Sequence, residues 1–292
     1  MPAKQKEKVT IDDYSPASES AWCPGCGNFG ILRSVDKALV GLQLAPHEVL
    51  MVSGIGQAAK LPHYTRANVF NGLHGRPLPA ALAAKMVNTD LVVIAESGDG
   101  DAYGEGGNHF LHTVNRNPNL TYLVHNNQVY GLTKGQASPT TDLGFTTKMN
   151  PDGAWVAMHP LAVAVACDCS FIARGFAGDI EHLADLIAQG VKHKGFALIE
   201  ILQPCVSFNK KNTYDWYRER VYKLEDEKGY DPGDRAAAFQ KALEWGDKIP
   251  TGVIYRNERE TFDEYVGVAG QSPVMKEKLD PKSITGLLKD FI

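Results

Sequence analysis

Two polar clusters in the first half of the chain contain residue types that can bind a metal ion and a phosphate group. Gly98-Asp99-Gly100-Asp101 follows the apolar run 91–95, and Asn126-Asn127 follows the apolar run 120–124. Mg²⁺ prefers hard oxygen ligands and usually keeps one or two protein side chains together with water and substrate phosphates. Glycine has no Cβ, so the backbone of the first cluster can approach a diphosphate closely. The two clusters therefore predict a Mg²⁺–diphosphate site that contains Asp99 and Asn127.

Each cluster is weak evidence when taken alone, because Asp-Gly pairs and asparagines are also common in turns. Two further polar or glycine-rich loops follow predicted strands, at Ser53–Gln57 and at Gln203–Cys205. Ligands of open α/β sheets bind at the edge formed by the carboxyl ends of the strands. The presence of all these loops at one edge favours a functional site over ordinary turns.

The order of the elements predicts an α/β fold. Short apolar runs alternate with segments of helical periodicity, which is typical of a parallel sheet with helices on both faces. Apolar spacing predicts helices around Ile31–Leu42, Pro79–Val87 and Ile180–Val191. The predicted strands are Val49–Ser53, Leu91–Ser97, Leu120–Asn126, Phe171–Arg174 and Ala197–Leu202.

The composition of the chain changes after about Lys210. Charged residues there are interleaved with aromatic ones, such as Tyr214 and Trp216, and there is little strand pattern. We expect a helical extension or arm that packs on its own domain or on a partner subunit. The predicted organisation is a flexible N-terminal tail (1–14), an α/β domain with the diphosphate site (15–210) and a C-terminal extension (211–292).

Composition excludes several classes of function. The 292 residues are 43% apolar and 22% charged, with a net charge of -4, which gives no reason to expect a nucleic-acid partner. No apolar run approaches the roughly 20 residues that a membrane-spanning helix needs, so we expect no membrane contact. The polar N-terminus lacks the apolar segment of a signal peptide. We therefore expect a cytoplasmic protein whose five cysteines are reduced thiols or metal ligands.

Three of the cysteines are candidates for an iron–sulfur cluster. Cys23 and Cys26 form a C-x-x-C loop ahead of a predicted helix, and Cys205 follows a predicted strand. Iron–sulfur clusters are usually held by four cysteines, so a fourth ligand is missing. Cys167 and Cys169 lie beside another strand, where packing is the better interpretation.

These motifs together resemble the β subunit of the 2-oxoacid:ferredoxin oxidoreductases, with the likeness running from about Ala21 to Asn212. The resemblance implies the thiamine diphosphate-binding fold. It also implies an enzyme that decarboxylates a 2-oxoacid, passes electrons through an iron–sulfur cluster to ferredoxin and forms acyl-CoA, or runs in reverse to fix CO₂. The motifs that carry it are Trp22–Gly27, Ser53–Gly56, Leu73–Arg76, Gly98–Asp101, Asn126-Asn127, Tyr130–Thr133 and Pro204-Cys205.

The resemblance also implies roles for individual residues. Mg²⁺ would be held by Asp99, the side chain of Asn127 and the main-chain carbonyl of Val129. A [4Fe–4S] cluster would be held by Cys23, Cys26 and Cys205. Thiamine diphosphate would contact Ile55, Gly56, Gln57, Ala58, His74, Gly98, Gly100, Asp101, Gly131 and Leu132.

One position departs from the family pattern. The family usually has its third cluster cysteine where this chain has Gln57. We expect the cluster to persist with an atypical fourth ligand, because loss of the cluster would relieve the need for the three matching cysteines. The Gln57 carbonyl, solvent or an added sulfide could occupy the fourth position.

The resemblance further implies a substrate and partners. Thr133 and Lys134 match positions near the substrate carboxylates, and the Leu132–Gln136 run favours 2-oxoglutarate over pyruvate. The glutamate that activates the aminopyrimidine would come from an α subunit that carries the pyrimidine-binding domain. This chain alone should then be inactive, and an (αβ)₂ assembly with coenzyme A and ferredoxin as further partners is expected.

Two alternatives remain open from the sequence. A non-redox thiamine diphosphate-dependent decarboxylase or carboligase would use the same diphosphate site and treat the three cysteines as structural. A non-catalytic subunit would bind a Mg²⁺–nucleotide or serve as an assembly scaffold. Iron content separates the first alternative from the redox enzyme, and ligand calorimetry separates the second.

Overall fold

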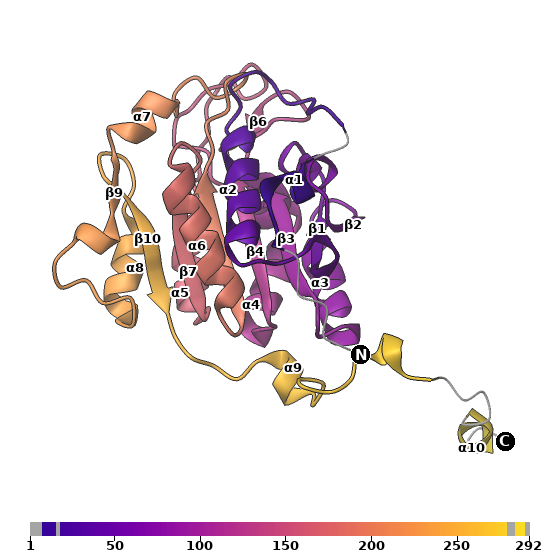
Figure 1. The fold of residues 1–292 in the computed structure, drawn as a ribbon. Coiled ribbons are helices and arrows are strands. Elements are labelled where there is room, and N and C mark those ends of the chain that lie inside the picture. The colour runs from indigo at the N-terminus through magenta and orange to yellow at the C-terminus, as the bar shows by residue number, and fades with distance from the viewer. Residues whose placement is uncertain (1–7, 16–17, 279–283, 290–292) are drawn as a thin grey trace.

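The structure, a computed structural model, describes residues 8–15, 18–278 and 284–289. An eight-stranded sheet forms its centre, with the strand order β2-β1-β3-β4-β8-β7-β10-β9 (Figure 1). Its strands are β1 (Val49–Ser53), β2 (Asn68–Asn71), β3 (Val92–Gly98), β4 (Leu120–Asn126), β7 (Phe171–Phe176), β8 (Phe196–Leu202), β9 (Val221–Lys223) and β10 (Ile249–Arg256).

The first six strands in this order are parallel to one another. Their carboxyl ends therefore meet at one edge of the sheet, which we call the carboxyl edge, and their first residues form the opposite amino edge. Only β10 runs antiparallel to its neighbour β7, and β9 is parallel to β10. A separate two-stranded hairpin, β5 (Val129–Tyr130) with β6 (Gln136–Ala137), follows β4 at the carboxyl edge.

Helices cover both faces of the sheet (Figure 1). Helices α2 (Asn28–Gly41) and α6 (Ile180–Lys192) pack on one face, where Ile94 and Leu123 are fully buried. The other face carries α3 (Pro77–Val87), α4 (Gly107–Arg116), α5 (Pro160–Ala166) and α8 (Arg235–Leu243). Neighbouring strand residues such as Ala95 and Val124 point to this second face. Because both faces are buried, the central strands are continuous apolar runs, as expected for a parallel sheet.

The predicted α/β fold and its five strands are confirmed. Two strands have the predicted bounds and three are shifted or extended by one or two residues. The expectation of little strand structure after Lys210 was wrong, because β9 and β10 join the main sheet. Strand β10 contains Pro250 and Gly252 and a register shift near Val253, and both residue types are depleted in strands.

The described part of the predicted N-terminal tail is docked on the domain. Helix α1 (Ile11–Tyr14) ends in a fully buried tyrosine whose hydroxyl donates to the carbonyl of Leu44 at 2.8 Å. Residues 1–7 lie outside the described residues. The three-part division of the chain stays a prediction.

After β10 the chain runs along the amino edge of the sheet and forms α9 (Phe262–Tyr265) (Figure 1). The backbone N–H of Asn119 donates to Asp263 at 3.1 Å, and the N–H of Phe262 donates to the carbonyl of Asn117. The remaining α-helices of the described residues are α7 (Tyr214–Arg218) and α10 (Ile284–Leu288). Within the described ranges, none of the helices has both the length and the apolar character required to cross a membrane.

Candidate active site

The register of the sheet brings the two predicted clusters together. Gly98, the last residue of β3, lies opposite His125 of β4. Asp99 and Asn127 therefore leave the sheet side by side at its carboxyl edge. A cavity at this edge is lined by Ile55, Gly56, Gln57, Ala58, His74, Gly98, Asp99, Gly100, Asp101, Asn127, Val129, Tyr130, Gly131, Leu132 and Thr133.

This lining contains every residue that the sequence predicted to contact Mg²⁺ or thiamine diphosphate. It also contains Thr133, but not Lys134. Tyr130 is a lining residue that was not predicted. The structure thus brings the residues predicted to bind the metal and the cofactor into one place.

Asp99 is the most buried carboxylate of the cavity, with 1% of its surface exposed. Its Oδ2 accepts hydrogen bonds from the hydroxyls of Ser138 and Thr140, the latter at 2.6 Å. Burial raises the pKa of Asp99 to about 6, against the opposing effect of these hydroxyls. A cation beside the carboxylate would favour its charged form.

Asn127 and Val129 supply further oxygens. The Asn127 side-chain oxygen accepts from the Val129 N–H at 3.0 Å, and Gln128 between them has a left-handed φ of 61°. A carboxylate, an amide oxygen and a main-chain carbonyl are a donor set that fits Mg²⁺. Within the described ranges, no three His, Cys, Asp or Glu side chains are close enough to hold a single metal ion. A site with one carboxylate, completed by phosphate and water, is consistent with that result.

Asp101 joins three segments of the site. Its Oδ1 accepts from the N–H of Gly75 at 2.7 Å and from the N–H of Ile55 at 3.1 Å, and its Oδ2 accepts from the Ser97 hydroxyl. The same Oδ1 lies 2.7 Å from Nδ1 of His74. The carboxylate therefore fixes the loops after β1 and β2 against β3. Because its oxygens are already hydrogen-bonded, the backbone of Asp101 would make any direct contact with a cofactor. Because Nδ1 of His74 is held, Nε2 is the nitrogen left to bind a phosphate.

Glycine is needed at two points of the cavity, for its conformation at Gly56 and for close packing at Gly100. Gly56 has a φ of +131°, and a Cβ placed there would have no atom within 4 Å. Only glycine readily adopts this conformation. A Cβ at Gly100 would lie 2.3 Å from the ring of Tyr130, so only a glycine allows this close packing. An open, glycine-lined backbone of this kind fits a diphosphate.

The loop of the β5–β6 hairpin presents the predicted substrate residues. The Thr133 hydroxyl donates to Gln136 at 2.6 Å. Lys134 is exposed and has a φ of 76°, which is uncommon for a residue with a side chain. Among the described residues, its amine has no hydrogen-bond or ion-pair partner. Such an outlier next to a cavity is typical of functional loops.

The three predicted cluster cysteines lie in adjacent loops. The Gly27 N–H donates to the Pro204 carbonyl at 3.1 Å, which holds the C-x-x-C loop beside Cys205. Burial raises the pKa of the Cys26 thiol, and the neighbouring Cys205 and Cys23 thiols raise it further. Each cysteine of a cubane cluster binds its own iron atom, so the thiols need not converge on one point. The arrangement fits a cluster held by three cysteines.

Gln57 lies between this region and the cavity. The indole N–H of Trp22, next to Cys23, donates to the Gln57 main-chain carbonyl at 2.8 Å. The Gln57 side-chain oxygen is buried and has no partner among the described residues. Of the atoms that could serve as a fourth cluster ligand, the main-chain carbonyl is thus already engaged and the side-chain oxygen is not.

A buried chain of polar groups anchors the start of α2, which follows the C-x-x-C loop. Nδ1 of His125 lies 2.8 Å from the Asn28 oxygen, and Nε2 lies 2.9 Å from Glu96. All three side chains are fully buried, and burial raises the pKa of Glu96. By contrast, Cys169 lies ahead of β7 at the amino edge and packs in the core.

Sequence reasoning missed the residues that hold the predicted ligands in place. Ser138 and Thr140 lie in the loop after β6, and Thr140 also lies 2.8 Å from the side-chain oxygen of Asn126. The run Ser138–Asp142 is rich in hydroxyls. A hydroxyl-rich loop between a short hairpin and a helix was the signal that could have indicated them.

Two family models match the chain. Residues 49–201 match the C-terminal TPP-binding domain of thiamine pyrophosphate enzymes, and residues 205–270 match the C-terminal part of the pyruvate ferredoxin oxidoreductase beta subunit. The chain is also 45% identical over 249 residues to the 2-oxoacid:ferredoxin oxidoreductase subunit beta of Saccharolobus solfataricus, which covers 81% of this chain and 82% of that protein.

Relatives with a more specific name are less similar. The 2-oxoglutarate oxidoreductase subunit KorB of Mycobacterium tuberculosis is 38% identical over 218 residues, covering 73% of this chain and 58% of that protein. A solved structure of 2-oxoglutarate:ferredoxin oxidoreductase from Magnetococcus marinus, with 2-oxoglutarate, coenzyme A and succinyl-CoA bound, has a TM-score of 0.88 and 33% identity. The match covers 97% of this chain and 96% of that chain.

These matches favour neither the non-redox enzyme nor the non-catalytic scaffold. The fold, the domain match and the sequence identity all indicate a thiamine diphosphate-binding subunit of a 2-oxoacid:ferredoxin oxidoreductase, over most of the chain. The chain belongs to the family of 2-oxoacid:ferredoxin oxidoreductase β subunits, and it contains the thiamine diphosphate-binding domain of that family.

Proposed function

We propose that this chain is the β subunit of a cytoplasmic complex that oxidises 2-oxoglutarate with coenzyme A and ferredoxin, or runs in reverse to fix CO₂. The observation that carries the proposal is the single cavity in which Asp99, Asn127 and Val129 lie beside the glycine-lined loops. The 2-oxoglutarate enzymes among the relatives support the choice of substrate.

Asp99, the Asn127 side chain and the Val129 carbonyl would hold Mg²⁺ in this proposal. When bound, thiamine diphosphate supplies an electron sink for decarboxylation of a 2-oxoacid. The chain itself would position the diphosphate through the backbone of Ile55–Ala58 and Gly98–Asp101 and through Nε2 of His74. Asp101 would keep these loops in register by accepting their N–H groups.

Cys23, Cys26 and Cys205 would hold a [4Fe–4S] cluster next to this cavity. The bond from Trp22 to Gln57 ties the loop of the cysteines to the loop that lines the cavity, and a short path of this kind suits electron transfer. The fourth ligand would be the Gln57 side-chain oxygen, solvent or sulfide.

Lys134 would bind the second carboxylate of 2-oxoglutarate, with Thr133 beside it. Its amine is exposed and without a partner among the described residues, so no existing ion pair has to be broken on binding. An α subunit would complete the site and supply the group that activates the aminopyrimidine. The isolated chain is then expected to be inactive.

The experiment that tests this proposal is a dye-reduction assay on the chain purified with its partner subunit. We expect activity with 2-oxoglutarate in the presence of coenzyme A and Mg²⁺. Lys134→Ala should raise KM chiefly for 2-oxoglutarate. Lys134→Arg keeps the positive charge and should have a KM close to that of the unmodified chain. Lys148→Ala, at another exposed lysine, should leave KM unchanged. An equal rise of KM for pyruvate would contradict the proposed role of Lys134.

The cluster is tested independently of the substrate. Iron and sulfide analysis of the anaerobically purified complex should give iron in amounts that match a cluster, with a paramagnetic signal on reduction. Gln57→Cys should change that signal, because a thiolate replaces the atypical ligand. Absence of iron would refute the cluster and leave the thiamine diphosphate site unaffected.

A further inference from the structure

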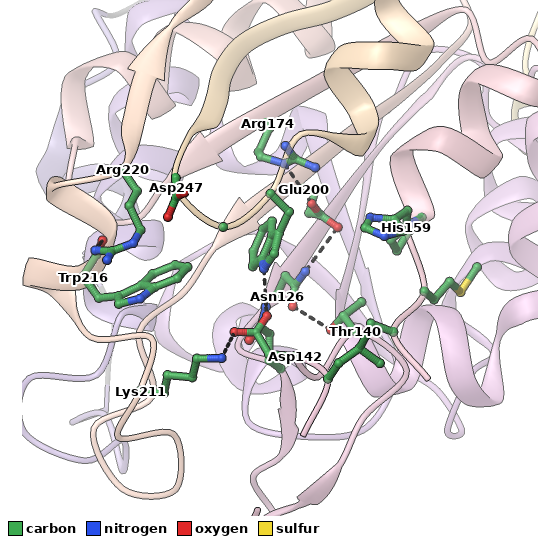
Figure 2. A pocket seen from close by; sticks show the side chains of 17 residues that line it. Asn126, Thr140, Asp142, His159, Arg174, Glu200, Lys211, Trp216, Arg220 and Asp247 are labelled. Atoms are coloured by element: carbon green, nitrogen blue, oxygen red, sulfur yellow. Dashed lines mark hydrogen bonds and ion pairs between the residues drawn. The ribbon is translucent and has the colours of Figure 1, made fainter. Parts of the chain in front are cut away.

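A second cavity lies at the carboxyl edge, apart from the one around Asp99 (Figure 2). It has a volume of about 400 Å³, within the range of small-molecule sites. Its lining comes from β4, β7 and β8, from the segment between β6 and the start of α5, from α7 and the residues beside it, and from the segment after α8. None of its lining residues lines the first cavity. Arg174, Glu200 and Asn126 face Trp216 and Arg220 across it (Figure 2).

Arg174 is the feature of this cavity that the proposed reaction does not explain. The side chain is 3% exposed. Its Nε donates to Glu200 at 3.1 Å, and its Nη2 donates to the Ala242 carbonyl at 3.4 Å. Its Nη1 is buried and has no partner among the described residues. A buried guanidinium donor left unpaired costs free energy, so a partner is expected in the cavity.

A second unpaired polar atom belongs to the same lining. The side-chain oxygen of Gln128, a lining residue that is 1% exposed, has no partner among the described residues. The hydroxyls of Tyr103 and Tyr217 are also buried and unpaired. Burial raises the pKa of both phenols; the charge of Glu200 raises it further for Tyr103, and the charges of Asp142 and Glu200 do so for Tyr217.

The carboxylates at the bottom of the cavity already have partners. Glu200 accepts from Arg174 and from the amide of Asn126, and Asp142 accepts from Lys211 at 2.8 Å and from the indole of Trp245 at 2.7 Å. Asp247 is exposed at the rim. Within the described ranges, the unpaired buried atoms of the lining are therefore one donor, Nη1 of Arg174, and one acceptor, the Gln128 oxygen.

Two tryptophans form the aromatic part of the lining, and Trp245 lies next to Arg174, whose guanidinium is 5.8 Å from its ring centroid. Trp216 and Trp245 have ring centroids 6.2 Å apart, and the Arg220 guanidinium lies 4.6 Å from the Trp216 ring centroid. Flat aromatic surfaces beside a guanidinium can bind the carbon part of a small molecule while the charge binds its polar end.

We propose that this cavity binds a small organic oxyanion, a compact molecule with a carboxylate or phosphate group, at a site separate from the thiamine diphosphate cavity. An oxygen of the ligand accepts from Nη1 of Arg174. Its carbon part lies against Trp216 and Trp245. Nη1 is the guanidinium nitrogen left without a partner among the described residues, and carboxylate and phosphate can each supply one charged oxygen to it.

The test is a titration of the full chain with succinate and with inorganic phosphate, at constant ionic strength, in the presence of saturating Mg²⁺ and thiamine diphosphate. Tryptophan fluorescence and calorimetry report binding. We expect saturable binding of at least one of the two, with a Kd of about 1 mM or lower. The succinate and phosphate arms identify which oxyanion the cavity prefers.

Variants assign the binding to this cavity. Arg174→Lys keeps the charge but loses the Nη1 donor, and should weaken binding about tenfold or more. Because the buried Glu200 could make that variant unstable, Arg220→Gln provides a second probe and should weaken binding about threefold. Trp245→Phe should remove most of the fluorescence change. Arg218→Gln, at an exposed position on α7 that does not line the cavity, is the matched control and should bind as the unmodified chain does.

Three results would overturn the proposal. One is the absence of saturable binding by either anion. Another is competition by thiamine diphosphate, which would place the anion in the first cavity. The third is equal weakening by Arg220→Gln and Arg218→Gln, which would indicate general charge attraction rather than a built site.

Discussion

Both edges of the central sheet bury polar side chains, but the two edges differ in how completely these side chains are hydrogen-bonded within the chain. At the amino edge, the Asn117 oxygen accepts from the Ser170 hydroxyl at 2.6 Å and from the Phe196 N–H at 2.8 Å, and its amide donates to the Glu260 carbonyl. His193 closes the group with a contact of 2.9 Å to Ser170. None of these side chains has an unpaired buried polar atom.

The carboxyl edge is the opposite case. Within the described ranges, the buried polar atoms that lack a partner belong to Asn28, Gln57, Glu96, Tyr103, Gln128, Arg174, His182, Gln203 and Tyr217. These residues lie near the carboxyl ends of the parallel strands or in the segments that follow them. A hydrogen-bond network that is complete within the chain contributes stability. An incomplete network leaves a polar group that a ligand or partner can bind. The comparison separates buried polar groups that the chain itself satisfies from those that it leaves unpaired within the described residues.

The largest expected effect tests the carboxyl edge directly. Asp99→Asn removes the charge that would face Mg²⁺ and should weaken Mg²⁺-dependent thiamine diphosphate binding at least about 100-fold, because groups that only orient a metal ligand are already worth about 10- to 100-fold. Calorimetry on the full chain measures it. Asp152→Asn, at an exposed loop position, is the control. An unchanged affinity for the cofactor in Asp99→Asn would show that the metal lies elsewhere.

The counterpart at the amino edge should affect stability only. Asn117→Ala leaves the Phe196 N–H and the Ser170 hydroxyl without their shared acceptor, at a cost of about 2.5 kcal/mol in the free energy of unfolding. Urea unfolding measures the loss, and cofactor affinity of the folded fraction should not change. A loss of affinity would mean that the two edges are not independent.

A histidine at the amino edge, His193, should also make the free energy of unfolding depend on pH. Burial, helped by the charge of Arg256, lowers the pKa of His193 to about 4. The unfolded chain binds the proton near pH 6.5, whereas the folded chain does so only near pH 4, so stability is full above pH 6.5 and falls as the pH drops through this range. At pH 5 the loss in the free energy of unfolding should reach about 2 kcal/mol, and His193→Gln should remove it.

Urea unfolding at pH 7.5 and pH 5 measures this difference. His63→Gln, at an exposed position, should keep the pH dependence of the unmodified chain. If His193→Gln and His63→Gln have the same slope, then His193 does not carry the effect.

The smallest expected effect on cofactor binding tests whether the Thr140 hydroxyl supports Asp99 through its hydrogen bond. Thr140→Val removes the hydroxyl next to Asp99 at nearly constant volume and should weaken Mg²⁺-dependent cofactor binding about tenfold. Thr140→Ser keeps the hydroxyl and should lose less than half of that effect. Both variants are measured by the same calorimetry, and equal losses would indicate packing rather than hydrogen bonding.

The sequence predicts the first cavity well because its residues come in short motifs at strand ends. Asp99 and Asn127 each follow an apolar run directly, so a linear pattern and the rule of the carboxyl edge are sufficient to bring them together. The central strands were predictable for the same reason, since strands buried on both faces are continuous apolar runs.

What the sequence did not indicate depends on contacts between distant segments. Thr140 reaches Asp99 from a loop without regular structure, and Arg174 meets Trp245 and Glu200 only after the strands have paired. Strand β10 was not predicted because it contains Pro250 and Gly252. No periodicity marks such positions, because tertiary packing rather than local preference decides them.

Thr140 has one hydroxyl hydrogen and two acceptors within reach, Asp99 Oδ2 at 2.6 Å and Asn126 Oδ1 at 2.8 Å. A hydroxyl donates one hydrogen bond at a time, so it serves either the carboxylate of the first cavity or the amide whose nitrogen contacts Glu200 in the second. A cation on Asp99 would free this hydrogen for Asn126. Rotation about a single C–O bond thus links the contents of the two cavities, without any movement of the backbone.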